Sequence, residues 1–218
     1  HLAIEASSHG IEQRRLDGLR LSAAAFTNLT HEHLDYHVSM DAYFAAKARL
    51  FDTLLTSGAT AVVNADSDRA EALGALCRRR GIRLWTYGAR GREFRLVAMA
   101  DAEGVHLSVE VLGIRREVEL PLVGGFQASN ALAALGLVVA TGSDPGRAVA
   151  GLASLTGAPG RLQFVARHHS GAAVYVDYAH KPEALETVLR TLRPFARGRL
   201  VVVFGCGGDR DRAKRPVM

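Results

Sequence analysis

The sequence predicts an α/β fold, in which a mostly parallel sheet with flanking helices and an antiparallel β extension is followed by the start of a second α/β unit. Three observations predict this fold. Apolar runs alternate with stretches of helical spacing up to residue 87, a rhythm typical of parallel sheets with crossover helices. Residues 94–122 change to β-type alternation. The Gly- and Pro-containing linker Thr156–Gly160 then separates two predicted domains, residues 1–157 and 158–218.

The expected elements of the parallel part alternate between strand and helix. In chain order they are a strand at His1–Glu5, a strand at Leu21–Phe26, a helix at Ala42–Leu55 with Asp41 as a candidate cap, a strand at Ala61–Asn64, a helix at Arg69–Arg80 and a strand at Ile82–Tyr87.

The remaining elements form the β extension, two helices and the second unit. In order they are strands within Phe94–Leu122 that include Val105–Leu112 and Glu117–Leu122, a helix at Gln127–Ala140 opened by Gly124-Gly125, a helix at Asp144–Ser154, a strand at Val174–Tyr178, a helix at Pro182–Phe195 and a strand at Arg199–Phe204.

Composition narrows the class of protein. The 218 residues allow one or two domains, and no run of eighteen apolar residues predicts a membrane span. The apolar start at His1, without Met or a basic region, indicates a fragment that begins inside a domain.

Cysteine content and charge indicate the compartment and the kind of partner. Cys77 and Cys206 form no disulfide framework, which favours the cytoplasm. The net charge of +5 suits an anionic small molecule. Clusters such as Arg78–Arg80 lack interleaved aromatics, so we expect no nucleic-acid partner.

The densest polar segment is Thr27–His37, which holds three histidines and two carboxylates. Lys47 follows on the next expected helix, and Glu5 is a further candidate oxygen donor. Oxygen-rich sites suit Mg²⁺, whereas a histidine-rich cluster suits Zn²⁺. The residues of this segment alone leave both metals open.

Polar or Gly-rich segments follow four expected strands. They are Glu5–Gly10, the segment from Thr27-Asn28 through the histidine cluster, Asp177–His180 and Gly205–Arg212. Ligand sites in α/β sheets lie beyond the carboxyl ends of strands, so we expect these segments to converge on one cleft.

Two of these features have a second interpretation. Gly205–Gly208 is similar to a phosphate loop, because glycines let backbone N–H groups approach an anion, but a tight turn has the same composition. The basic run Arg210–Arg215 favours phosphate, although charge runs are usually solvated. Lys47 lies among alanines and is either an ordinary solvated lysine or a buried one that must lose its charge or change chemically.

Taken together, these motifs resemble those of the Mur ligases, the ATP-dependent amide ligases of peptidoglycan precursor synthesis. The matching segments, in order, are Glu5–Gly10, Thr27–His37, Ala42–Lys47, Asn130–Ala134, Pro159–Arg161, Asp177–Pro182 and Gly205–Asp211. The resemblance covers essentially the whole chain. It implies that residues 1–157 belong to a P-loop-type central ATPase domain that lacks its N-terminal phosphate loop. Residues 158–218 then begin a Rossmann-like C-terminal domain.

The resemblance also implies a role for each matching site residue. Glu5 and His33 match Mg²⁺ ligands. Lys47 matches a lysine that carries CO₂ as a carbamate and helps hold Mg²⁺. The implied catalytic residues are His33 and Lys47. The positions that match contacts to the UDP-muramyl-dipeptide are Ser7, Ser8, Gln13, Arg15 and Asn28. For the nucleotide, Asn130 matches an adenine contact, Asp177 a ribose contact and Arg161 a further contact. The resemblance also implies that Arg210 and Lys214 face the incoming amino acid and the phosphates.

The implied reaction adds a diamino acid to UDP-N-acetylmuramoyl-L-alanyl-D-glutamate with ATP and Mg²⁺. The Arg- and Ala-rich composition favours meso-diaminopimelate over L-lysine. We expect a cytoplasmic monomer, and we expect the fragment alone to be inactive without the phosphate loop. The alternatives are another ligase of the superfamily, such as cyanophycin or folylpolyglutamate synthetase, and a non-catalytic nucleotide-binding module.

Overall fold

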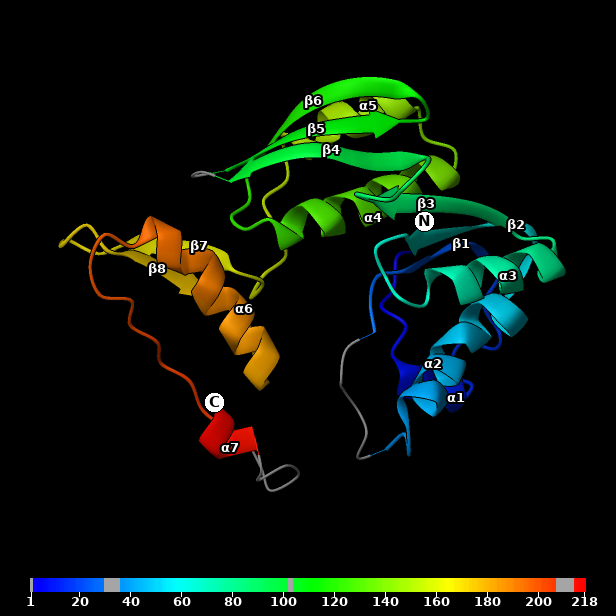
Figure 1. The fold of residues 1–218 in the computed structure, drawn as a ribbon, viewed down its shortest axis with the longest axis horizontal. Coiled ribbons are helices and arrows are strands. Elements are labelled where there is room, and N and C mark those ends of the chain that lie inside the picture. The colour runs from blue at the N-terminus through cyan, green and yellow to red at the C-terminus, as the bar shows by residue number, and fades with distance from the viewer. Residues whose placement is uncertain (1, 30–35, 102–103, 207–213) are drawn as a thin grey trace.

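The structure is a computed structural model that describes residues 2–29, 36–101, 104–206 and 214–218, apart from the side chains of Asp101 and Lys214. It contains a six-stranded sheet and a two-stranded sheet (Figure 1). The strands of the larger sheet, in spatial and chain order, are β1 (Leu21–Phe26), β2 (Leu55–Asn64), β3 (Arg83–Gly88), β4 (Phe94–Asp101), β5 (Val105–Val111) and β6 (Ile114–Leu120).

The larger sheet is parallel in its first half and antiparallel in its second. β1, β2 and β3 pair in parallel, and β3 joins β4 in parallel over a short stretch. β4, β5 and β6 then form an antiparallel meander. Leu112 and Gly113 connect β5 to β6, and both have positive φ angles of 50° and 84°, as a type I′ hairpin turn requires. The predicted fold class is therefore confirmed.

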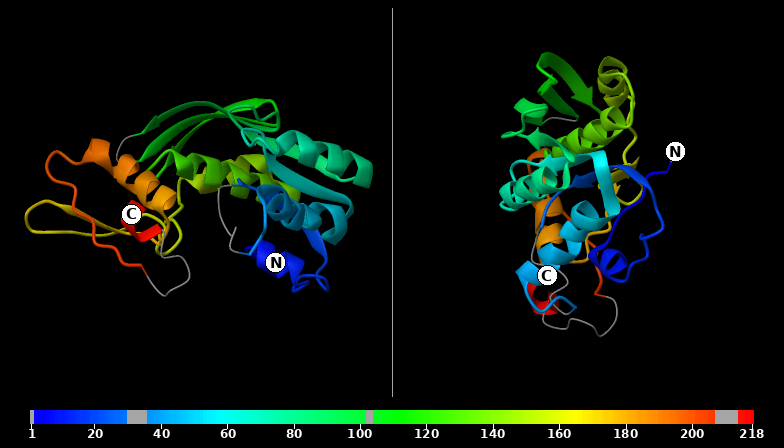
Figure 2. Two further views of the ribbon diagram at one scale, coloured as in Figure 1. Left: turned by 60° about the horizontal axis from the view of Figure 1, so that its bottom comes forward. Right: turned by 90° about the vertical axis from the view of Figure 1, so that its right-hand side faces the viewer.

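Helices cover both faces of the larger sheet. They are α1 (Ser8–Glu12), α2 (Met40–Arg49), a π-helical segment (Leu50–Leu54), α3 (Ala70–Arg80), α4 (Phe126–Ala140) and α5 (Pro145–Leu152). Helix α4 packs on one face of the parallel strands, and α3 packs on the other. Figure 2 shows this layering from two further directions.

The alternation of side chains along β2 divides the core into two parts. Val62 belongs to the cluster with α4 and β4–β6, whereas Ala61 and Val63 belong to the cluster with α3 and the π-helical segment. All three residues are fully buried. Gly136 of α4 lies directly over Val62, and a Cβ atom at Gly136 would be 2.6 Å from Val62 Cγ1. Close approach of α4 to β2 therefore depends on this glycine.

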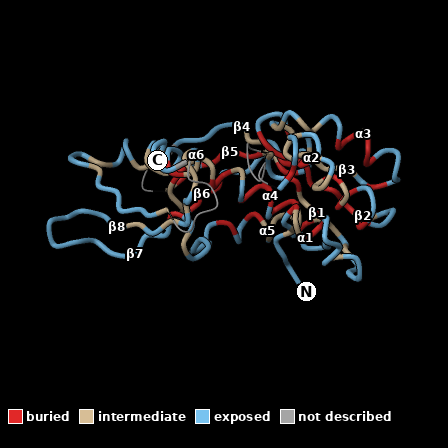
Figure 3. The backbone as a smooth tube through the Cα atoms, turned by 90° about the horizontal axis from the view of Figure 1, so that it is seen from below, coloured by how far each residue is buried: buried red, intermediate tan, exposed pale blue. Residues whose placement is uncertain are grey.

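The second unit consists of β7 (Gln163–Arg167), β8 (Ala173–Val176), α6 (Pro182–Leu192), a 3₁₀ turn (Arg193–Phe195) and α7 (Lys214–Val217). β7 and β8 form an antiparallel hairpin. Every residue of β7 is exposed. Figure 3 shows buried backbone concentrated in the first unit and exposed backbone along this hairpin. The predicted boundary at residues 157 and 158 lies between α5 and β7, and it remains a prediction.

Two predicted strands are wrong. Residues 2–5 of the expected strand His1–Glu5 form no strand, and Leu2 is 76% exposed. Residues 199–204, all of which are described, also form none, and Val203 is 95% exposed. An apolar run becomes a buried strand only where a neighbouring strand supplies hydrogen bonds and a helix covers its face. Neither segment is placed in either sheet.

Two smaller expectations also need correction. The N-cap of α2 is Ser39, whose Oγ accepts a hydrogen bond from the Ala42 amide at 3.1 Å, and Asp41 lies in the first turn instead. β7 was not predicted, because residues 163–167 show no alternation that distinguishes a strand from a loop. The other predicted helices and strands form within a few residues of their expected limits, although β2 begins earlier, at Leu55.

Candidate functional site

A cavity with a volume of about 840 Å³ lies along β1 in the first unit. It is lined by the residues before α1, by β1 and by one side of α2. Of the residues matched to a site by sequence, those that line it are Glu5, Ser7, Ser8, Asn28 and Lys47. Three segments that are separate in the sequence therefore supply these polar groups to one cavity, and two of them, Glu5–Gly10 and the segment that begins at Thr27, are among the four that were expected to converge.

The two serines at the start of α1 point in different directions. Ser7 is exposed and caps the helix, since its Oγ accepts a hydrogen bond from the Gly10 amide at 3.1 Å. Ser8 is only 2% exposed, and its hydroxyl shares a buried hydrogen bond of 3.0 Å with His37 Nε2. Gln13 and Arg15, also predicted to contact substrate, follow α1 and are exposed.

Lys47 is partly buried on α2. Its Nζ atom lies 5.2 Å from the centroid of the Tyr43 ring, one turn earlier on the same helix. Tyr43 is buried, at 3% exposure. Lys47 therefore projects from a packed helix into the β1 cavity, rather than lying on a fully solvated face.

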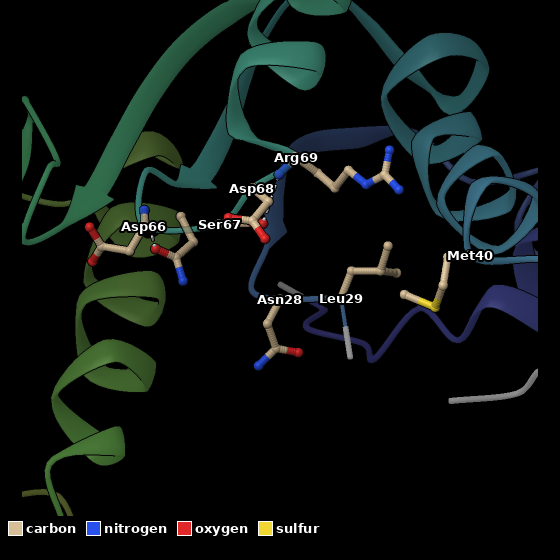
Figure 4. A pocket seen from close by; sticks show the side chains of 8 residues that line it. Asn28, Leu29, Met40, Asp66, Ser67, Asp68 and Arg69 are labelled. Atoms are coloured by element: carbon tan, nitrogen blue, oxygen red, sulfur yellow. Dashed lines mark hydrogen bonds between the residues drawn. The ribbon is translucent and has the colours of Figure 1, made fainter. Parts of the chain in front are cut away.

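A second cavity, of about 610 Å³, lies beyond the carboxyl ends of β1 and β2. Its residues come from those strand ends and from the starts of α2 and α3 (Figure 4). Asn64 donates from Nδ2 to the Thr27 carbonyl at 2.8 Å, which ties the two strand ends together. Asp66 accepts hydrogen bonds from the Ala89 and Arg90 amides at 2.7 and 2.9 Å. Asn28 lines both cavities.

A separate polar cluster lies at the start of the second unit. Asp177 accepts hydrogen bonds from the Leu162 amide at 2.6 Å and from the Ala179 amide at 2.7 Å. The guanidinium of Arg161 lies 5.2 Å from the Tyr178 ring centroid. Leu162 has a φ of 47°, a strained value for leucine, which these contacts hold in place. The Pro159–Arg161 and Asp177–His180 motifs are therefore neighbours.

The structure brings the matched residues together in two groups rather than in one. Glu5, Asn28 and Lys47 share the β1 cavity, whereas Arg161 and Asp177 form the second cluster and do not line that cavity. Asn130 is exposed on α4, and its Nδ2 donates to Gln127 Oε1 at 3.2 Å. His33, Arg210 and the side chain of Lys214 lie outside the described residues.

The predicted metal site is only partly within the described residues. Among those residues, no three His, Cys, Asp or Glu side chains are close enough to hold a metal ion. Glu5 and a carbamate on Lys47 would both offer oxygen atoms to the same cavity. Such a donor set fits Mg²⁺ better than Zn²⁺, because hard cations prefer oxygen ligands.

Two polar residues at these sites, Asn64 and Asp66, were missed by the sequence analysis, which counted His37 only as one of three histidines in the segment Thr27–His37. The two residues at the end of β2 carry the usual signal, which is a polar side chain beyond the carboxyl end of a parallel strand. His37 gives no such signal, because its burial becomes visible only when α1 and α2 are placed together.

Both units match one protein family. The family model of the Mur ligase middle domain matches residues 1–138, and that of the Mur ligase glutamate ligase domain matches residues 160–218. The chain, an α/β protein with a polar cavity along its parallel strands, belongs to the Mur ligase family.

Among its relatives are proteins named UDP-N-acetylmuramoyl-L-alanyl-D-glutamate–2,6-diaminopimelate ligase. The one from Caulobacter vibrioides is 52% identical over 219 residues, and the one from Mesorhizobium japonicum is 50% identical over 220 residues. Each alignment covers 100% of this chain and 45% of the relative. The chain thus spans less than half the length of these curated relatives.

A solved structure of a ligase with the same name is similar in fold. It has a TM-score of 0.75 and 37% sequence identity, and it covers 98% of this chain and 44% of its own. No helix in the described segments is both long and apolar enough to cross a membrane.

Proposed function

We propose that the full-length protein containing this chain is an ATP-dependent ligase that joins meso-diaminopimelate to UDP-N-acetylmuramoyl-L-alanyl-D-glutamate. The observation that carries the proposal is an identity of 50–52%, over the whole chain, with relatives named for this pair of substrates. The arrangement of Glu5, Asn28 and Lys47 around one cavity supports it. The same relatives favour a role in peptidoglycan precursor synthesis in the cytoplasm, and we expect a monomer.

The proposed reaction has two steps. A carboxylate oxygen of the nucleotide-sugar peptide attacks the γ-phosphorus of ATP, the bond to the β–γ bridging oxygen breaks, and ADP leaves. The amine of meso-diaminopimelate then attacks the carbonyl carbon of the acyl phosphate, loses a proton and expels inorganic phosphate. Closure of the C-terminal unit over the site would exclude water, which otherwise hydrolyses the acyl phosphate.

The residues of the β1 cavity are assigned to the charge of the transferring phosphoryl group. Glu5, His33 and Lys47 are the proposed Mg²⁺ ligands, with Lys47 as a carbamate. That group forms when the neutral Nζ amine attacks CO₂ and loses a proton. Bound Mg²⁺ would neutralise the phosphate oxygens during transfer. The position of Lys47, partly buried and lining the β1 cavity together with Glu5, supports this assignment.

The other matched residues are assigned to the two large substrates. Asn130, Arg161, Asp177 and Lys214 are proposed to bind ATP, whereas Ser7, Ser8, Gln13, Arg15 and Asn28 are proposed to hold the nucleotide-sugar peptide, with Arg210 facing the incoming amino acid. The contact between the Pro159–Arg161 and Asp177–His180 motifs supports a shared nucleotide role for the second cluster.

The test is a substrate-dependence assay on the full-length protein. ATP, Mg²⁺ and UDP-N-acetylmuramoyl-L-alanyl-D-glutamate are supplied with meso-diaminopimelate, L-lysine or no amino acid, and phosphate release and product mass are measured. We expect phosphate release and the amide product with meso-diaminopimelate, and far less with L-lysine.

Each other outcome argues against the proposal. Preference for L-lysine would change the assigned amino acid. Turnover with a folate and glutamate, but none with the nucleotide-sugar peptide, would assign the chain to a different ligase reaction. ATP binding without any ligation would favour a non-catalytic nucleotide-binding module.

A further inference from the structure

The proposed reaction leaves His37 without a role, although its side chain forms a buried polar pair with Ser8, a residue assigned to substrate binding by sequence position alone. Ser8 and His37 are 2% and 3% exposed, and Ser8 Oγ lies 3.0 Å from His37 Nε2. Burial of a hydroxyl or an imidazole without a hydrogen-bond partner is unfavourable, so each side chain fixes the position of the other. The contact joins segments 29 positions apart in the sequence.

Contacts on its other sides fix the orientation of the imidazole. Nδ1 of His37 lies 3.5 Å from a Glu12 carboxylate oxygen. The ring stacks on the buried Tyr43 ring, with centroids 5.0 Å apart and an interplanar angle of 21°. A histidine that is contacted at both ring nitrogens and on one face has a defined rotamer. His37 is therefore a rigid bridge between α1 and α2.

This bridge leads to Lys47. Tyr43 stacks on His37, and Lys47 Nζ is 5.2 Å from the centroid of the same Tyr43 ring. Tyr43 and Lys47 are four residues apart on α2 and so lie on one face of the helix. A continuous series of contacts thus connects Ser8, through His37 and Tyr43, to the lysine that projects into the β1 cavity.

A second connection holds the far end of the same loop. Arg49 donates from Nη1 to the Ile11 carbonyl at 2.9 Å and pairs through Nη2 with Asp17 at 2.8 Å. The hydrogen bond from Arg49 also lowers the pKa of the Asp17 carboxyl below its usual value. Segment 7–19, which carries the exposed Ser7, Gln13 and Arg15, is therefore attached to α2 at two points.

The series Glu12, His37 and Ser8 has the order of a carboxylate–histidine–serine nucleophile, but its burial excludes that role. A nucleophilic hydroxyl must meet its substrate, and Ser8 is only 2% exposed. The same burial means that the hydroxyl makes its contact inside the protein.

We propose that His37 is a positioning residue that acts through Ser8. The pair fixes the loop of residues 7–19, and with it the side chains of Ser7, Gln13 and Arg15, at a set distance from Lys47. The ligand of this loop is the nucleotide-sugar peptide, so the inference rests on the proposed function. It assigns His37 and Ser8 to affinity for that substrate, and not to affinity for ATP.

The test uses the full-length protein with His37→Phe, His37→Gln, Ser8→Ala and the double variant of His37→Phe with Ser8→Ala. Phenylalanine keeps the stacking on Tyr43 but loses the hydrogen bond, whereas glutamine keeps a polar group for Ser8. His169→Phe, in the exposed β7–β8 hairpin, is the matched control. Calorimetry measures Kd for UDP-N-acetylmuramoyl-L-alanyl-D-glutamate, kinetics measure KM for ATP, and hydrogen–deuterium exchange is measured over residues 7–19.

We expect His37→Phe to raise that Kd about tenfold, equivalent to about 1.4 kcal/mol, and to change KM for ATP less than twofold. His37→Gln recovers most of the affinity. The Kd of the double variant is no higher than that of His37→Phe alone, because both substitutions remove the same contact. Exchange over residues 7–19 becomes faster in His37→Phe, and His169→Phe behaves as the wild type.

An unchanged Kd in His37→Phe overturns the proposal, as does a double variant whose effect is the product of the single effects. An equal rise in KM for ATP would indicate general damage and also contradicts it. If the wild type binds no nucleotide-sugar peptide, the proposed function fails. Exchange over residues 7–19 then still decides whether His37 fixes the loop, and unchanged exchange overturns that part.

Discussion

Replacement of Gly136 by alanine tests the close approach of α4 to β2. The added Cβ would lie 2.6 Å from Val62 Cγ1 and 3.6 Å from Phe94 Cε2. Unstrained carbon contacts are about 3.5–4.0 Å, so the helix or the strand must move. Val62 cannot turn away easily, because it is β-branched and fully buried in a central strand. Overpacking of this kind destabilises by about 1–3 kcal/mol, and the helix propensity of alanine offsets about 1 kcal/mol. We expect a net loss of up to about 2 kcal/mol.

The matched control is Gly151→Ala in α5, where no atom lies within 4 Å of the added Cβ. There the same change should stabilise by up to about 1 kcal/mol. Urea unfolding of the 218-residue chain measures the free energy of unfolding of both variants. The transition is followed by the fluorescence of Trp85, the single tryptophan. Adding Val62→Ala to Gly136→Ala should cost less than the sum of the two single changes, because it removes the methyl groups that clash. A Gly136→Ala variant as stable as Gly151→Ala would refute this reasoning.

Three further outcomes are expected. Lys47→Ala in the full-length protein should lower ligase turnover by at least about a hundredfold, and added acetate should restore part of it. The same variant should lose the carbamate signal in NMR with ¹³C-bicarbonate. Normal turnover of the variant in CO₂-free buffer would show that Lys47 is an ordinary helix residue. Burial raises the pKa of the Cys77 thiol from 9.0 to about 11. Since the unfolded chain ionises first, the free energy of unfolding should fall as pH rises from about 9 to about 11, by up to roughly 2–3 kcal/mol, and a Cys77→Ala variant with the same slope would contradict this. Asp177→Ala should speed amide hydrogen exchange at Leu162 and Ala179 about tenfold, because it removes the acceptor of both amides, and unaltered protection would disprove that role.

The fold was predictable where local pattern and tertiary surroundings agree. Helix α3 has its apolar residues at helical spacing and ends at Gly81, which has a φ of 64° and accepts the left-handed conformation of a helix end. β1 to β3 are apolar runs bounded by polar turns, and each meets a neighbouring strand. In these segments the sequence carries enough information to define the element, although β2 begins at Leu55 rather than at the predicted Ala61.

Prediction failed where strand formation depends on a distant partner. Residues 199–204 are as apolar as β2, yet Val201 is 77% exposed, because no strand of the described chain pairs with this segment. β7 shows the converse. Its five residues are all exposed, and its strand arises only from pairing with β8. Pairing of this kind is a property of three-dimensional contacts that composition and periodicity do not encode.

The candidate site was predictable in part. Strand-end position placed Asn28 at the β1 cavity, and the alanine-rich setting of Lys47 singled out that lysine. Glu5 also lines the cavity, although no strand precedes it. The role of His37 was not predictable, because a histidine between Tyr36 and Val38 in a polar segment gives no sign of burial. Its partner Ser8 is as polar as its exposed neighbour Ser7, and only the packing of α1 against α2 distinguishes them.

The larger sheet has two outer strands of opposite character. β6 reads Ile-Arg-Arg-Glu-Val-Glu-Leu, and its charges discourage another chain from adding a strand at that side. β1 reads Leu-Ser-Ala-Ala-Ala-Phe, has no charge, and among the described strands pairs with β2 alone. An outer strand without charged side chains lacks the feature that discourages pairing with a further strand. In concentrated solutions of the 218-residue chain, self-association should therefore begin at β1, and a lysine introduced at the exposed Ser22 should suppress it.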